Sequence, residues 1–153
     1  MLNIFSFHIQ RDSTDLTSLL DSYYDVKNAL IHSDAPTAAA KAAEFIKASN
    51  SFEMKTLPAG KSGTFMSLQK SLISDAEYIK GTKDIAKQRD YFAAFSRDFY
   101  TLAKTLKVSG HPVYQQYCPM KKMYWLSSEA SIKNPYFGNA MLSCGSVAET
   151  INP

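Results

Sequence analysis

The chain has 153 residues, of which 45% are hydrophobic and 20% are charged. This composition is ordinary for a folded globular protein and excludes a disordered chain. A net charge of +3 comes from scattered basic residues and not from a basic stripe, so we expect no nucleic-acid partner. No run reaches the ~18 apolar residues of a membrane span. We therefore predict no transmembrane segment.

The first 12 residues are interpreted as an N-terminal arm. Phe5, Phe7 and Ile9 alternate with polar residues, which suits either a short strand or a tail. The chain starts without Lys or Arg before its apolar patch and without a small-residue cleavage site, so it is a poor signal peptide. Either the protein is cytosolic or an export signal has been removed.

Four segments carry apolar residues at spacings of three and four, which predicts four helices. The first begins after caps at residues 12–14 and runs to about Leu30, and the others cover 37–54, 64–80 and 85–106. Short joins between amphipathic helices predict an up-down bundle. The predicted fold class is all-α: a four-helix bundle over 13–107 with a loop-rich appendage over 108–153, together forming one domain.

Motifs that would indicate catalysis are incomplete. Gly60, Lys61 and Ser62 suggest a phosphate loop, but Lys55 stands where that motif has its first glycine and no strand precedes it, so a turn is predicted. Ser127 lies in no Gly-x-Ser-x-Gly elbow and is interpreted as a turn cap. We therefore expect no enzymatic activity.

The two cysteines and two nearby methionines form the candidate site. Cys118 and Met120 come early in the appendage, and Met141 and Cys144 come late. An extended Cys-Pro-Met segment would place Cys118 and Met120 on the same side, and a helical turn would do the same for Met141 and Cys144. Thiolate and thioether sulfur select Cu(I) and similar soft ions. His111 is a further candidate ligand, and Met123 has less weight.

Two other interpretations of the cysteines stay open. A pair of cysteines in an exported protein is commonly a structural disulfide, here Cys118–Cys144. Two unrelated buried thiols are the third possibility. The histidines do not help to decide, because His8, His32 and His111 lack the paired spacing of a His-x-x-x-His zinc site.

The C-terminal part resembles a family of helical domains of unknown function in exported bacterial proteins. The signature consists of Tyr117–Met120, Trp125–Ser127, Asn134–Gly138, Met141–Leu142 and Cys144–Gly145. Additional residues that look familial lie in the helices: Arg89, Phe92, Ser96, Leu102 and the segment from Tyr23 to Leu30. Members occur alone or joined to periplasmic adaptor subunits of copper/silver-type efflux pumps.

The resemblance implies a periplasmic or otherwise exported protein with a link to copper. Its cysteine and methionine positions correspond to Cys118, Met120, Met141 and Cys144, all of which are present. We therefore expect a domain that binds Cu(I) or a similar ion in heavy-metal handling or efflux, with copper(I) as the cofactor. The alternative is a disulfide-clamped interaction module without metal. An efflux adaptor or another envelope protein is the expected partner in either case.

Overall fold

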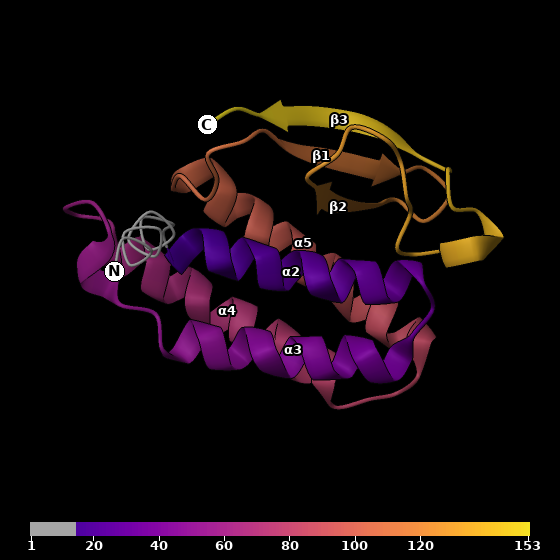
Figure 1. Cartoon of the computed structure of the whole chain (residues 1–153), viewed down its shortest axis with the longest axis horizontal. Coiled ribbons are helices and arrows are strands. Elements are labelled where there is room, and N and C mark those ends of the chain that lie inside the picture. The colour runs from indigo at the N-terminus through magenta and orange to yellow at the C-terminus, as the bar shows by residue number, and fades with distance from the viewer. Residues whose placement is uncertain (1–14) are drawn as a thin grey trace, which may run out of the picture.

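The computed structural model describes residues 15–153, so the arm predicted over residues 1–12 lies outside the described part. Within residues 15–153 four helices precede the strands, and in Figure 1 consecutive helices run back and forth beside one another. Their bounds are α2 (Asp15–Ile31), α3 (Ala35–Asn50), α4 (Ser62–Lys80) and α5 (Ile85–Thr105). The four predicted helices are confirmed. The second is shorter than predicted, because a separate 3-10 turn, η1 (Met54–Thr56), follows it.

Polar caps fix where the helices begin. The Asp34 carboxylate accepts a hydrogen bond from the Thr37 amide at 3.1 Å at the start of α3, and Asp84 accepts one from the Ala86 amide at 3.0 Å at the start of α5. Each cap satisfies a backbone donor that has no partner within the helix. The Gly60-Lys61-Ser62 segment is the turn that leads into α4, since the Lys61 amide donates to the Pro58 carbonyl at 3.2 Å.

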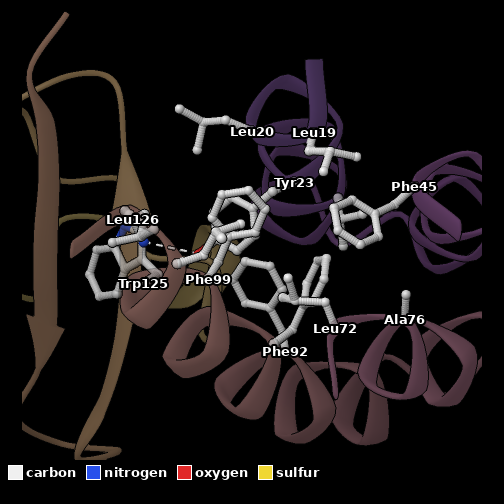
Figure 2. Packing of buried hydrophobic residues seen from close by; sticks show 14 of the residues in the cluster. Leu19, Leu20, Tyr23, Phe45, Leu72, Ala76, Phe92, Phe99, Trp125 and Leu126 are labelled. Atoms are coloured by element: carbon white, nitrogen blue, oxygen red, sulfur yellow. Dashed lines mark hydrogen bonds between the residues drawn. The ribbon is translucent and has the colours of Figure 1, made fainter. Parts of the chain in front are cut away.

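Tyr23 of α2 stands at the centre of the core, as Figure 2 shows. Its ring centroid lies 5.1 Å from that of Phe92, 5.3 Å from Phe95 and 5.2 Å from Phe99, all on α5. Phe45 of α3 meets Phe95 edge to face at 4.8 Å. These fully buried rings contribute large apolar areas and favourable ring contacts, so they hold the helices together.

The all-α assignment is wrong for the appendage, which contains a three-stranded antiparallel sheet. The strands are β1 (Val113–Cys118), β2 (Met123–Ser127) and β3 (Ser146–Ile151), in the order β2-β1-β3. Tyr117 pairs with Tyr124 across β1 and β2 and with Ser146 across β1 and β3. The protein is thus mostly helical, with a small sheet at its C-terminal end.

The sheet lies over the helical layer (Figure 1) and is joined to it by a buried polar link. The Leu126 amide of β2 donates to the Tyr23 hydroxyl at 2.9 Å, and that hydroxyl lies 2.7 Å from the Ser96 hydroxyl of α5. Because Trp125 and Leu126 are also buried in the common core, apolar packing and satisfied hydrogen bonds both fix the sheet on the helices.

A long loop, residues 128–145, covers one face of the sheet. Gln116 and Cys118 lie two apart on β1, so their side chains point to the same face. The Gln116 amide nitrogen donates to the Glu129 carbonyl at 2.9 Å and to the Ala130 carbonyl at 3.2 Å. The face that carries Cys118 is therefore the one that the loop covers.

Candidate metal centre

Cys118 is the last residue of β1, and its side chain is 0% exposed. The segment that follows is a tight turn to β2 in which the Lys122 amide donates to the Cys118 carbonyl at 2.7 Å. The Lys121 amide points at the Cys118 sulfur at 3.4 Å. The extended Cys-Pro-Met geometry that we predicted is therefore wrong, because Met120 lies in the turn.

Cys144 lies in the loop, at the end of a second turn. Its amide donates to the Met141 carbonyl at 3.1 Å, which matches the turn predicted for this segment. The next residue, Gly145, has φ +141°, and a Cβ there would lie 2.8 Å from the Tyr117 carbonyl oxygen and 3.0 Å from the Trp125 ring. Only glycine permits this backbone to pass so close to the strands. That close approach brings Cys144 to the end of β1.

The two thiols interact with each other. The pKa of Cys144 is raised first by burial and then by the neighbouring Cys118 thiol. Both cysteines are free thiols in the structure. Two neighbouring thiols can lose their protons and share one soft metal ion, or they can be oxidised to a disulfide. The packing of Gly145 against the Tyr117 carbonyl places the adjoining residues Cys144 and Cys118 close to each other.

The other predicted ligands are Met120, Met141 and His111, and the structure does not place them in contact with the two thiols. Met120 is 66% exposed and Met141 is 41% exposed, and each lies in the turn next to one cysteine. His111 precedes β1, whereas Cys118 ends it, so about 20 Å of extended strand separates the two residues. His111 lines a pocket with Lys107 and the chain's C-terminal residues. The structure therefore does not bring His111 to the thiols.

Asn134 supports the loop at the thiols, a role that the sequence analysis did not assign to it although it begins the Asn134–Gly138 part of the signature. Its side-chain nitrogen donates to the Cys144 carbonyl at 2.8 Å, and its side-chain oxygen accepts from the Tyr136 amide at 2.7 Å. The Tyr136 hydroxyl in turn donates to the Tyr124 carbonyl of β2. The Asn134-Pro135 pair was a recognisable turn signal, but its partners lie on other segments and leave no local pattern.

Arg89 of α5 holds the same loop at Pro135. Its Nε donates to the Pro135 carbonyl at 2.8 Å, and its Nη2 donates to the Leu30 carbonyl at 2.9 Å and to the Ser33 hydroxyl at 3.0 Å. The fixed fork of a guanidinium suits three oxygens from separate segments. Arg89 thereby joins the start of α5, the end of α2 and the loop that carries Cys144.

Ser127 acts as a turn cap, as predicted. Its hydroxyl accepts from the Glu129 amide at 3.0 Å and lies 3.4 Å from the Lys27 amine. Both Ser127 and Lys27 are buried, and burial lowers the pKa of Lys27 to about 8. This contact secures the end of β2 on α2.

Residues 15–153 contain neither a cluster of the usual metal ligands nor a helix suited to crossing a membrane. Within this range, no three His, Cys, Asp or Glu side chains gather into a group that could hold a metal ion. None of the helices described there combines the length and the apolar character that crossing a membrane requires.

Comparison with known proteins gives one match. The family model described as "Protein of unknown function (DUF3347)" matches residues 19–111. The matched range comprises most of the helical layer and ends before β1, so both cysteines lie outside it. Searches of curated proteins and of solved structures found no match. Because the matched range is more than half of the chain, the chain belongs to the DUF3347 family of proteins of unknown function.

Proposed function

We propose that this protein binds a soft metal ion of the Cu(I) type through sulfur ligands and serves in heavy-metal handling or efflux. The observation that supports the proposal best is the close approach of Gly145 to Tyr117, which places the free cysteines Cys144 and Cys118 near each other. Two thiolates favour Cu(I) over hard cations such as Mg²⁺ or Ca²⁺. Reversible coordination needs no activated nucleophile, so we propose a binding role and no catalysis.

The two cysteines have different roles in this proposal. Cys118 is fully buried at the end of a paired strand and has the Lys121 amide beside its sulfur, so it is the fixed ligand. Cys144 is partly exposed and sits in a loop, so it is the ligand through which the ion enters and leaves. Each thiol gives up its proton when the ion binds.

Met120 and Met141 are proposed as neutral donors that assist exchange. Both thioethers are exposed and lie in the turns that follow Cys118 and precede Cys144. An unbranched, flexible methionine side chain can reach an ion without a change in the backbone. A neutral thioether holds Cu(I) less tightly than a thiolate, which keeps the ion transferable. We leave His111 out of the ligand set because of its distance from the thiols.

The sulfur ligands are tested by anaerobic competition of the full chain with a Cu(I) chelator. We expect Cys118→Ser and Cys144→Ser each to lower the affinity by at least about a hundredfold, because each removes one of two thiolates. Met120→Leu combined with Met141→Leu conserves volume and should lower the affinity by about tenfold.

Met66→Leu is the matched control, since Met66 is 52% exposed on α4 and should leave the affinity unchanged. If both cysteine variants bind Cu(I) as the unaltered chain does, the proposed site is wrong. If only the double methionine variant does so, the thioethers take no part.

The cellular setting is proposed from the family resemblance. We place the protein in the periplasm or elsewhere in the cell envelope, with an efflux adaptor or another envelope protein as its partner. Fractionation of cells that express the full-length protein tests this. Recovery in the cytosolic fraction alone would contradict it.

A second candidate function rests on the same two thiols. A disulfide between Cys118 and Cys144 would tie the loop to β1 and make the appendage a clamped interaction module without metal. Oxidation would release two protons and pass two electrons to an oxidant such as a periplasmic dithiol oxidase. In that case, replacing both cysteines by serine should cost about 2–5 kcal/mol of stability whether or not copper is present. A thiol count on unfolded, non-reduced protein distinguishes the two candidates.

A further inference from the structure

The outward side of α5 forms one wall of a groove beside the β1–β2 turn. Two open pockets, of about 380 Å³ and about 430 Å³, lie along this helix and share Met123 in their lining. Their α5 residues are Ala86, Arg89, Asp90, Ala93, Arg97 and Tyr100. These residues follow the three-and-four spacing of one helix face, so the two pockets lie along the same side of α5 and meet at Met123; we refer to them together as the groove.

The charges in this groove are mainly positive. Arg89 and Lys121 line the first pocket, and Arg97 and Lys122 line the second. None of these four cations forms an ion pair with another residue of the described chain. Asp90 is the carboxylate in the lining, and Asp75 lies near Arg97. An excess of unpaired cations attracts a negatively charged partner.

The remaining lining is apolar and aromatic. Tyr136 and Phe137 line the first pocket, and Tyr100 and Tyr124 line the second. The Lys121 amine lies over the Phe137 ring at 5.3 Å. Aromatic residues together with methionine and arginine are typical of the parts of a surface that bind other proteins.

The length of the groove indicates the kind of partner. From Ala86 to Tyr100 the helix extends for about 21 Å at about 1.5 Å per residue. An extended peptide of about six residues has this length at about 3.3 Å per residue. We infer that this groove binds an acidic segment of a partner protein, with its carboxylates on the cations and one or two apolar side chains against Met123 and the tyrosines.

The groove is a surface distinct from the proposed metal ligands but adjoins them. Lys121 and Lys122 belong to the turn that follows Cys118, and their amides contact the Cys118 sulfur and carbonyl. A partner bound here would lie next to the thiols. The inference itself does not require metal, because the groove is built from α5, the β1–β2 turn, β2 and the loop around Tyr136.

A blocked six-residue peptide of alternating Glu and Leu is the probe, titrated into metal-free, isotopically labelled full chain and followed by NMR. We expect saturable shifts that cluster at Ala93, Tyr100, Met123 and Tyr124. Lys121→Glu combined with Lys122→Glu should weaken binding by about tenfold, because two attractive charges become repulsive.

The control variant is Lys47→Glu combined with Lys70→Glu, which changes the net charge equally at exposed sites on α3 and α4 and should alter the affinity less than about twofold. A peptide with Lys in place of Glu should not bind. Shifts scattered over the whole surface, equal weakening in both variants, or no saturable shift in the unaltered chain would each overturn the inference. The shift map of the unaltered chain decides the question even if a variant fails to fold.

Discussion

Lys27 is a buried amine on the inner side of α2. It is 7% exposed, its amine lies 5.0 Å from the centre of the Tyr24 ring, and its hydrogen bond to Ser127 is long, at 3.4 Å. Burial lowers its pKa from 10.5 to about 8, with Glu129 opposing the shift and Lys133 adding to it. A charged lysine in this place destabilises the fold, because the charge is incompletely compensated.

We predict that Lys27→Met raises the free energy of unfolding at pH 7 by about 1–3 kcal/mol. The folded pKa is lowered, so the unaltered chain gains stability as the pH rises from about 8 to 10.5. The methionine variant should lack that gain. Urea unfolding over this pH range measures both effects. The control is Lys47→Met, at an exposed lysine, which should change stability by less than about 0.5 kcal/mol. If Lys27→Met instead lowers the free energy of unfolding, the buried amine stabilises the fold and the prediction is wrong.

Asp75 of α4 and Asp98 of α5 form a carboxyl pair between neighbouring helices. The pKa of Asp75 is raised to about 8, first by burial and then by a hydrogen bond and charge repulsion from Asp98, while Arg97 lowers it. The Asp75 Oδ2 atom is buried without a hydrogen-bond partner. Two close carboxyl groups share one proton more easily than they carry two charges, so the folded protein holds a proton here.

This pair should make stability fall as the pH rises. Because the folded pKa of Asp75 is raised above the unfolded value of 3.8, its contribution is fully present below about pH 4 and is lost as the pH passes through about 8. Asp75→Asn keeps the shape without the charge and should remove this part of the pH dependence. Chemical unfolding at several pH values tests it. Asp90→Asn, on the exposed side of α5, should leave the change of unfolding free energy with pH as it is. If Asp75→Asn also leaves this pH dependence unchanged, the attribution to the Asp75–Asp98 pair is wrong.

The loop that carries Cys144 depends on contacts with α5 and with the end of α2. Arg89 makes three hydrogen bonds that converge on this junction. Gly138 has φ +55°, and a Cβ there would lie 2.7 Å from the Ser33 hydroxyl and 2.8 Å from Arg89 Nη2. The junction has neither space nor suitable backbone geometry for a side chain at this position.

Replacing Arg89 with alanine should therefore lower stability by about 2–3 kcal/mol, because buried carbonyl groups lose a charged donor. Hydrogen exchange should accelerate in the loop at residues 134–145 more than in the helices. Gly138→Ala should produce the same local loosening by a steric route. Arg97→Ala, at an exposed arginine of α5, is the control. If exchange accelerates equally in every helix, Arg89 does not act on the loop specifically.

The helices were predictable because their signals are local. Asp34 and Asp84 act as caps next to apolar residues at helical spacing, and the strict pattern of α5 places Phe92 and Phe99 in the core. The predicted end of the second helix, at residue 54, lies beyond the observed end of α3 at Asn50. The apolar pattern continues past Asn50, but the chain leaves the helix there and forms η1.

The sheet was missed because its strands are short and weakly patterned. β1 contains Gln115 and Gln116, and prolines flank it on both sides, so the segment resembles a loop in sequence. Gln116 can be buried because its amide donates to three carbonyls of the covering loop. No pattern in the sequence around Gln116 indicates these partners. The pairing of Asp75 with Asp98 was missed for the same reason, since it depends on how two helices pack.

The soft-donor pattern predicted a site that contains Cys118 and Cys144, but it did not predict how the fold brings the two cysteines close to each other. The two cysteines meet because antiparallel pairing returns β3 beside β1 and brings Gly145 against Tyr117. Their sequence positions do not contain this information. The methionines are adjacent to the cysteines in sequence, so they follow them into the turns, whereas His111 is carried to the opposite end of β1.

The described part of the chain consists of four helices and a small sheet, and the sheet with its loop carries both cysteines. The family match covers most of the helical layer and stops before the sheet, while the sheet and its loop hold both thiols. Tyr23, Ser96 and Leu126 couple the two parts through buried hydrogen bonds. A rigid support with ligands in turns and loops is a common arrangement for a binding site that must also release its ligand.

The most direct measurement is X-ray absorption at the copper edge on the full chain loaded anaerobically with one equivalent of Cu(I). We predict a first shell of sulfur atoms alone, with fewer sulfurs in the Met120→Leu and Met141→Leu double variant. A shell of nitrogen or oxygen, or a chain that yields all of its Cu(I) to a weak competing chelator, would contradict the proposed soft-metal site at Cys118 and Cys144.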